Sequence, residues 1–569
     1  MYVKTTTRKA KSGTIRYLHL AHNDWDASKG RSVPKVLYSF GREDKLDRDA
    51  VRRLVASLSQ LMRPGQTPPG GPHLTFAESR PYGGAYVLDQ LWHRLGMAKI
   101  LAGLASPGRG RPRDAAAAER VLFGLVANRA LAPSSKLAAS EWMSHDVCIN
   151  GLGEVSDDAC YRAMDWLHQV HGELEKQVYL AAAGLLGLEV DLLLFDTTST
   201  YFELEEADEA VTRNSRGEEA GSEDDADPAR SAGFRTYGRS RDDRDDLPQI
   251  VIGLAVTRDG IPVRVWCWPG NTTDATLIQQ VRSDVREWSP AKIIWVADRD
   301  LSPAEGRRAL RRNTGSYIIG EKLRPDSPHA RAALSCPGRY RPIAANLRVR
   351  EVRVGDTEDR FVLCHSPDAA ARDAAARGRL VADLEGRIAG SDGLTAAKRA
   401  ELRRRIAAVP GLDRFLRVTP GGLLRVDKAK ERAERDLDGT YLLRCADPDL
   451  SAEDVALGYK QLLEVERSWR DMKTVLKLRP VYHRLEGRIR AHVLLCWLAL
   501  LLVRVAENKA GDTWTRMRRE LDRIHIVTFT GSTGTFQQVT ELSDPARDLL
   551  ARLETDPPRR IFHLSPAES

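Results

Sequence analysis

The N-terminal residues alternate between apolar and polar positions, which is the period of a β-strand. The alternation is clearest at Thr14–Leu20 and Val33–Phe40, on either side of a polar turn. A helix is expected over residues 47–62, and a stretch rich in Pro and Gly follows it. We therefore expect a first domain, a basic β unit and a linker, over residues 1–72.

A period of three to four residues then replaces the alternation and predicts helices. Ser156 stands where an N-cap is expected for the last of them, with Asp157 in its first turn. The pattern predicts a helical domain over residues 73–187. We expect it to bind DNA through its Arg-rich loop at 109–113, although an ordinary helical domain fits the pattern equally well. The four helical segments are 85–95, 115–130, 134–143 and 157–168.

From residue 190 onward, apolar runs of strand length alternate with helical segments. Val190–Asp196 and Ile293–Asp298 each predict a buried strand that ends in a carboxylate, and 250–257 and 261–268 predict a hairpin. This order predicts an α/β core. The expected parts are the first part of the core at 188–324, a β-rich insertion with a helical stretch at 325–450, the last core helices at 451–510, and a C-terminal tail region at 511–569.

Composition adds a size estimate and a charge pattern. The chain has 569 residues, 42% of them hydrophobic, which suits roughly two to four packed domains and excludes a disordered protein. Its formal charge of +8 hides local extremes. Residues 1–80 hold 15 Lys and Arg against 7 Asp and Glu, and residues 459–504 hold 10 against 4, whereas residues 203–227 hold 11 Asp and Glu against 2 Arg. The basic segments are compatible with a polyanionic partner.

The cysteines and the apolar runs indicate the compartment. Seven cysteines are scattered without a C-x-x-C pair, which argues against a disulfide framework and a zinc ribbon and favours a reducing cytosol. The polar N-terminus, Met1–Thr5, does not resemble a signal peptide. The longest apolar run, Val493–Val503, is too short to span a bilayer and predicts a buried helix. We expect a cytoplasmic protein without a membrane partner.

Three carboxylates stand out as candidate chemistry. Asp196 and Asp298 each end a predicted strand, where metal and phosphate sites of α/β proteins are found, although such an Asp also commonly caps a turn. Glu466 lies on a predicted helix beside Arg470 and Lys473, which alone fits a solvated salt-bridge face equally well. Together the three can hold two Mg²⁺ ions roughly 3.5–4 Å apart, the arrangement used for in-line displacement at phosphorus.

The spacing around Glu466 matches a known signature. The pattern Tyr-x2-Arg-x3-Glu-x6-Lys falls on Tyr459, Leu462, Glu466 and Lys473, with Leu462 in place of the Arg. Further matching segments are Phe195–Tyr201, Gly238–Asp242, Leu247–Gly253, Pro269–Asp274, Val296–Asp300, Arg479–His483 and Ile489–His492. The chain thus resembles the DDE transposases of bacterial insertion sequences, in the YREK branch that has a β-strand insertion before the catalytic Glu.

The resemblance implies a fold and an activity. It implies an RNase H-like catalytic core with a β-rich insertion, and Asp196, Asp298 and Glu466 as catalytic residues and ligands of two Mg²⁺ ions, for which Mn²⁺ can substitute. It further implies a homodimer that pairs DNA ends, binds terminal inverted repeats and target DNA, and catalyses strand cleavage and strand transfer in a bacterial cytoplasm, on the nucleoid. The residues expected to contact DNA are Tyr459, Arg467, Arg470 and Lys473, with Arg467 or Arg470 replacing the missing Arg.

Other interpretations stay open at this stage. Phe195-Asp196-Thr-Thr also resembles the nucleophile strand of phosphohydrolases that form an aspartyl-phosphate, but Thr198 stands where those enzymes have a second Asp. A structure-specific nuclease would share the carboxylates, and so would an inactive DNA-binding relative. Glu464 competes with Glu466 as the third carboxylate, and Trp469 is either a core residue or a ring that stacks on a base.

Overall fold

The computed structural model describes residues 2–566 except 11–12, 27–29, 48, 50, 53–54, 56–73, 106–113, 186–191, 205, 215–216, 221–226, 258, 274–276, 278–279, 282, 285–291, 298–315, 322, 324–327, 355–358 and 532–533. The chain is a mixed α/β protein, as predicted. Its contacts divide it into two compact units, and each is described by itself. Unit 1 comprises Met1–Gly187, Ile261–Val263 and Arg470–Ser569, and unit 2 comprises Leu188–Gly260 and Arg264–Trp469.

The N-terminal β unit is a three-stranded antiparallel sheet in the order β1-β2-β3. Its strands are β1 Tyr2–Ala10, β2 Gly13–Asp26 and β3 Arg31–Arg42. The two predicted strands are confirmed within β2 and β3, and β1 pairs with β2 from Tyr2–Ala21 to Ala10–Gly13. The predicted linker at 63–72 and most of the helix expected at 47–62 lie outside the described residues.

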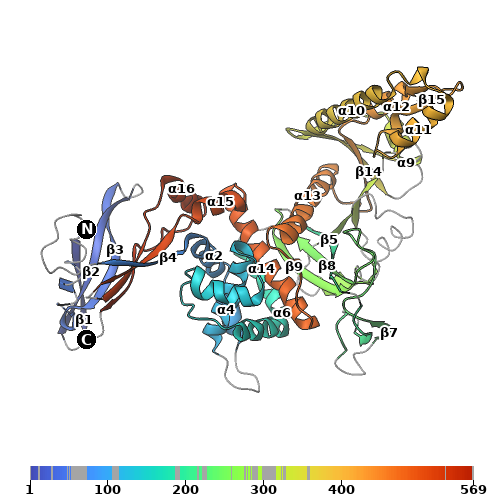
Figure 1. Ribbon diagram of the computed structural model, residues 1–569. Coiled ribbons are helices and arrows are strands. Elements are labelled where there is room, and N and C mark those ends of the chain that lie inside the picture. Colours follow the sequence, from blue (N-terminus) through green and yellow to red (C-terminus); the bar gives the residue numbers. More distant parts are fainter. Residues whose placement is uncertain are drawn as a thin grey trace. The chain divides into compact units, whose positions relative to one another are not determined.

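The helical part of unit 1 packs around one helix, α14, which is buried from Ile489 to Glu507. All four predicted helices are present, and Ser156 Oγ accepts a hydrogen bond from Ala159 N at 3.2 Å, as its predicted capping role requires. Figure 1 shows α2, α4, α6 and α14 gathered together. The helices are α2 Gly83–Arg94, α3 Met97–Leu104, α4 Ala115–Leu131, α5 Lys136–Glu141, α6 Asp157–Leu185 and α14 Glu486–Ala510. The Arg-rich loop at 109–113 lies outside the described residues.

Helix α14 is the core element of this unit. By length and composition it could cross a membrane, but its most apolar 18-residue window is entirely buried inside the protein. Its packing against α4 and α6 accounts for that burial. Near its C-terminal end, the buried Arg504 guanidinium pairs with Asp471, at 2.8 Å, and with Glu507. The predicted buried helix at Val493–Val503 is therefore confirmed.

Segments from both ends of the chain share a second sheet in unit 1. Its order is β20-β19-β18-β4, and β18 pairs with β4 from His525–Pro81 to Thr530–Thr75. Tyr82 and Gly83, at the start of α2, both donate backbone hydrogen bonds to Ile524 O. The elements are β4 Thr75–Pro81, α15 Trp514–Leu521, β18 His525–Gly531, β19 Gly534–Val539, α16 Asp544–Arg552 and β20 Ile561–Pro566.

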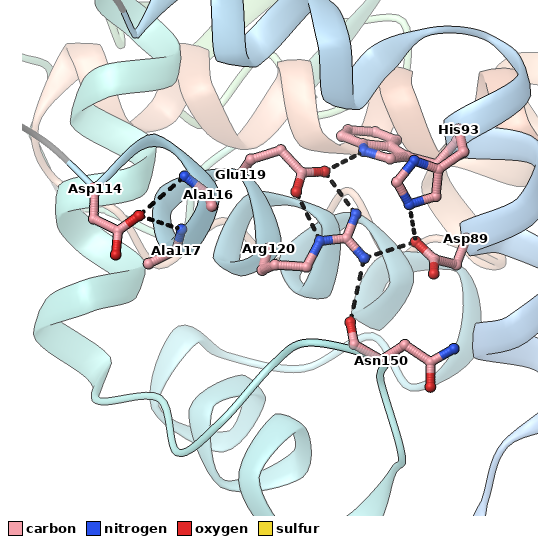
Figure 2. Close-up of polar contacts among 9 residues, drawn as sticks. Asp89, His93, Asp114, Ala116, Ala117, Glu119, Arg120 and Asn150 are labelled. Atoms are coloured by element: carbon pink, nitrogen blue, oxygen red, sulfur yellow. Dashed lines mark hydrogen bonds and ion pairs between the residues drawn. The ribbon is translucent and has the colours of Figure 1, made fainter. Parts of the chain in front are cut away.

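A buried ion-pair network joins α2 to α4 (Figure 2). The Arg120 guanidinium donates to both Glu119 oxygens and to Asp89 Oδ1, each at 2.7 Å. The Trp92 indole donates to Glu119 Oε1 at 2.6 Å, and His93 lies 3.4 Å from Asp89. Two carboxylates thus neutralise the buried cation, as burial of a charge requires.

Unit 2 contains a nine-stranded mixed sheet in the order β12-β13-β14-β17-β11-β10-β5-β8-β9. Strands β5, β10 and β11 are neighbours and parallel, and β8 is antiparallel to β5. The strands are β5 Leu192–Tyr201, β8 Gln249–Val256, β9 Pro262–Pro269, β10 Lys292–Ala297, β11 Tyr317–Glu321, β12 Arg341–Ala344, β13 Leu347–Val352, β14 Arg360–His365 and β17 Thr440–Cys445.

The strands of the predicted insertion extend this sheet. Strand β17 pairs with β14 on one side and with β11 on the other, so the segment after residue 325 continues the sheet of the core. The predicted helical stretch is confirmed as two helices, and a further helix follows them. These are α10 Pro367–Ile388, α11 Ala396–Ala407 and α12 Lys428–Arg435. Around Leu384, Ile406 and Phe415 they enclose a small apolar core of their own.

Candidate active site

Asp196 lies on strand β5 at the point where the pairing of β5 with its neighbour β10 ends. The parallel pairs between β5 and β10 run from Leu192–Lys292 to Phe195–Trp295, so Asp196 follows them directly. The sequence pattern predicted that this strand ends at Asp196, but β5 continues beyond it. It continues to Tyr201 because its Thr and Ser residues still pair with β8, up to Tyr201–Gln249. The Asp196 side chain is half-buried at this edge.

The second predicted Asp cannot be placed in the same way. Asp298 directly follows Ala297, the last residue of β10, and lies outside the described residues, as do Asp274 and Asp300. Within the part of the chain that the structure describes, no three His, Cys, Asp or Glu side chains come together as a metal site. The three-carboxylate site therefore stays a prediction.

Glu466 is carried by helix α13, Ala452–Thr474, whose start is firmly anchored. Ser451 caps it, accepting from Asp454 N at 3.0 Å while Ser451 N donates back to the Asp454 carboxylate at 3.3 Å. Just before the cap, the buried Asp447 accepts from Ser316 Oγ at 2.7 Å, and Arg360 donates to three carbonyls of residues 447–450. These bonds tie the helix to strands β11 and β14.

The fold of unit 2 brings Asp196 and Glu466 within electrostatic reach of each other. Burial raises the pKa of Asp196 to about 6, and the Glu466 charge contributes to that rise. The backbone N–H of Thr197, the Arg241 guanidinium and the Trp469 indole lower the pKa of Asp196, because each favours its ionised form. Where one carboxylate raises the pKa of another, a bound divalent cation would offset the repulsion between them.

Arg241 is a site residue that the sequence analysis did not single out. It belongs to the loop before β8, where its backbone N–H donates to Ser199 Oγ at 2.8 Å and its Nη2 donates to Thr197 Oγ1 at 3.3 Å. The loop approaches the β9 end closely, since a Cβ on Gly238 would lie 2.0 Å from Gly270 O. The segment Gly238–Asp242 was noted as a motif similar to the family, but the motif did not show which of its Arg residues acts on the pKa of Asp196.

Trp469 is part of the core, which was one of its two predicted roles. Its side chain is 6% exposed, so it is not available to stack on a base in this conformation. It lies three residues after Glu466, hence on the same side of α13, and its indole is one of the groups that act on Asp196. Its role here is to line the carboxylate site.

The predicted DNA-contacting residues are spread along α13. Tyr459 is half-buried and packs against Tyr441 of β17, with ring centroids 5.8 Å apart. Arg467 is half-buried, Arg470 is exposed and Lys473 is half-buried, the last two in the part of the helix that belongs to unit 1. Their contacts with DNA stay predictions.

Comparison with known proteins gives one family match. Residues 3–68 match the model of the IS1634 family transposase N-terminal domain. No curated protein matches the chain. Among solved structures, the chain is similar to a cryo-EM structure of a piggyBac transposase synaptic complex with hairpin DNA, with 11% identity, 78% of each chain covered and a TM-score of 0.30. That TM-score is too low to support an argument. The N-terminal match supports an insertion-sequence transposase.

Proposed function

We propose that the chain is a DDE transposase of an insertion sequence, with Asp196, Asp298 and Glu466 as its catalytic carboxylates on an RNase H-like core. The observation that carries the proposal is that the charge of Glu466 acts on Asp196 in unit 2, although the helix and the sheet strand that carry them are far apart in the sequence. The N-terminal transposase domain supports it independently. Asp298 is included because it directly follows β10, the parallel neighbour of β5.

The donor set suits Mg²⁺, with Mn²⁺ as a substitute. Carboxylate oxygens are hard ligands, and the raised pKa of Asp196 reflects a buried acidic site that a cation would stabilise. Two ions held there would activate the attacking oxygen and stabilise the leaving oxygen in an in-line displacement at phosphorus. Arg241 and Trp469 keep Asp196 ionised at neutral pH. Arg470 and Lys473, further along α13, attract DNA phosphates.

The proposed substrates are the terminal inverted repeats of the element and a target DNA. Strand cleavage at the ends precedes transfer of the free 3′-OH into the target, and a homodimer pairs the two ends in the bacterial cytoplasm. The mixed sheet, with β5 and β10 adjacent and parallel, supports the assignment of an RNase H-like core.

The decisive experiment is Mg²⁺-dependent cleavage of a plasmid that carries the element's own ends. We expect the wild type to cut and join at those ends, and Asp196→Asn, Asp298→Asn and Glu466→Gln to bind the DNA without cutting it. Glu453→Gln is the matched control, because it removes an exposed carboxylate from the same helix and is expected to cut normally.

Each other outcome discards part of the proposal. A variant that still cuts removes its residue from the site. Cleavage without joined products favours a structure-specific nuclease. Binding without cleavage by any of the proteins, in Mg²⁺ and in Mn²⁺, favours an inactive DNA-binding relative.

A further inference from the structure

A pocket of about 450 Å³ opens in the helical part of unit 1. Helices α4, α5, α6 and α14 and the loop between α13 and α14 contribute to its wall. The lining residues used below are Arg129, Lys136, Lys477, Tyr482, His483 and His492. Nothing in the proposed cleavage reaction uses this pocket.

The lining of this pocket is cationic and contains no carboxylate. Lys136 and Arg129 are each only 3% exposed, and among the described residues no Asp or Glu pairs with either of them. Arg129 donates to carbonyls and to an amide oxygen, and its Nε has no hydrogen-bond partner. The contrast with Arg120 in Figure 2, which two carboxylates neutralise, is direct. An anion from outside the protein would compensate this buried positive charge, which no carboxylate of the pocket lining does.

The pKa values of the pocket groups reflect this uncompensated positive charge. Burial, and then the charge of Arg129, lower the pKa of Lys136 to about 7. Burial and the charges of Lys136, Arg488 and Arg129 lower the pKa of His483 to about 4. A bound anion would reverse these effects by attracting protons to both groups. The volume exceeds that of a single water and admits a phosphate group.

The rim of the pocket indicates where the phosphate comes from. Tyr482 lines the pocket and is 75% exposed, so its aromatic ring is accessible from solvent. The exposed Lys477 also lines the pocket. A phosphate site flanked by a free aromatic face and a further cation is the combination that binds a nucleotide of a nucleic-acid strand.

We propose that this pocket binds a phosphate group of a nucleic-acid strand through Arg129 and Lys136, with the adjoining base stacked on Tyr482. The preference for phosphate rests on the pocket alone, whereas the choice of a nucleic acid as its source rests on the proposed function. Contacts of this kind would hold a DNA strand on unit 1 independently of metal binding in unit 2.

The first arm of the test uses inorganic phosphate as the probe, by calorimetric titration of the full chain in EDTA. We expect the wild type to bind and Lys136→Met to bind at least about tenfold more weakly, the loss typical of one charged hydrogen bond. Lys99→Met is the matched control, since it removes an exposed lysine of the same unit and should leave binding unchanged. Equal affinities of the wild type and Lys136→Met would overturn the proposal.

The second arm uses a 5′-phosphorylated single-stranded oligonucleotide, by fluorescence anisotropy in EDTA. We expect both Lys136→Met and Tyr482→Ala to weaken its binding, while Tyr482→Ala leaves inorganic phosphate binding intact. Tyr482→Ala changes an exposed side chain, so we expect this variant to fold as the wild type does. Phosphate binding that depends on Lys136, with oligonucleotide binding insensitive to both variants, would make free phosphate the ligand and overturn the nucleic-acid assignment.

The two proposals fail separately. Neither arm needs divalent metal, so a chain that never cleaves DNA can still bind phosphate and the oligonucleotide through this pocket. Glu466→Gln is expected to abolish cleavage and to bind both probes as the wild type does. A loss of probe binding in Glu466→Gln would contradict the separation of the two sites.

Discussion

Asp196 illustrates how neighbouring groups set the chemistry of one side chain. Burial and Glu466 favour its protonated form, whereas Arg241, Trp469 and the Thr197 N–H favour the ionised form. With a pKa of about 6, the balance leaves it mostly ionised at neutral pH. A metal ligand must be ionised, so the groups that shift this balance are expected to control activity without touching DNA.

Arg241 should therefore act as a positioning residue. Its positive charge lowers the pKa of Asp196, so Arg241→Gln is expected to raise that pKa above about 6. The acid limb of the cleavage rate, where activity is lost as the pH falls, then moves to higher pH. Cleavage rates between pH 5.5 and 8.5 measure this shift. Arg239→Gln, an exposed residue of the same loop, is the control, and a shift of equal size in both variants would refute the role.

The burial of Lys136 is expected to lower the free energy of unfolding, because the buried amine loses its proton more easily than the unfolded one. Between about pH 7 and the ordinary lysine pKa of 10.5, the unfolded amine is protonated and the folded amine is not, so the free energy of unfolding rises with pH in that window. Besides burial, the titratable groups that act on the pKa of Lys136 are Arg129, which lowers it, and the thiols of Cys496 and Cys160, which raise it. Each pKa unit corresponds to about 1.4 kcal/mol.

Removal of this amine gives the test. Lys136→Met is expected to be more stable than the wild type at pH 7, and the difference should shrink towards pH 10. Denaturant midpoints of the two proteins at both pH values measure it. A variant that is less stable than the wild type at pH 7 would show that the amine has a stabilising partner.

Helix α13 shows what a capped helix contributes to a site. Ser451 and Asp454 satisfy each other's backbone N–H groups, so the helix that carries Glu466 starts at a fixed point. Ser451→Ala should cost about 1 kcal/mol locally. Hydrogen exchange measures this effect, and we expect faster exchange in the first turn of α13 with no change in α14. Unchanged exchange in that turn would mean that Asp447 and Arg360 anchor the helix without the cap.

Helices and strands were predicted correctly where the spacing of apolar residues within one segment indicates them. Strands β8 and β9 and helices α2, α4 and α6 follow from apolar residues in short runs or at spacings of three and four. The end of β5 was predicted five residues too early, because Thr and Ser after Asp196 resemble a loop in sequence. Only the pairing with β8 turns them into a strand.

Within unit 1, the two ends of the chain depend on each other. Strand β4 pairs with β18, and Gly83 at the start of α2 lies against the chain between α15 and β18, where a Cβ would be 2.4 Å from Leu521 O. The helical cluster therefore starts against residues from the far end of the sequence. A side chain at Gly83 should disturb both segments at once.

Two glycine variants distinguish the effect of this contact on stability from the effect of helix propensity. Gly83→Ala is expected to destabilise unit 1 by about 1–3 kcal/mol, because the Cβ meets backbone. Gly103→Ala, on α3 with open space around it, should stabilise by about 0.5–1 kcal/mol. Melting temperatures of the full chain measure both. A Gly83→Ala protein as stable as the wild type would show that the chain near Leu521 yields easily.

The sequence by itself determined the classes of element, the carboxylates Asp196 and Glu466 as candidates, and the basic N-terminal β unit that matches a transposase domain. These follow from local periodicity and from motif spacing, which one stretch of chain contains. The tertiary structure alone decided that the charge of Arg241 acts on Asp196, that β4 joins β18, and that Lys136 is buried in a pocket without a carboxylate. Each of these depends on pairing between distant segments, for which a linear pattern carries no signal.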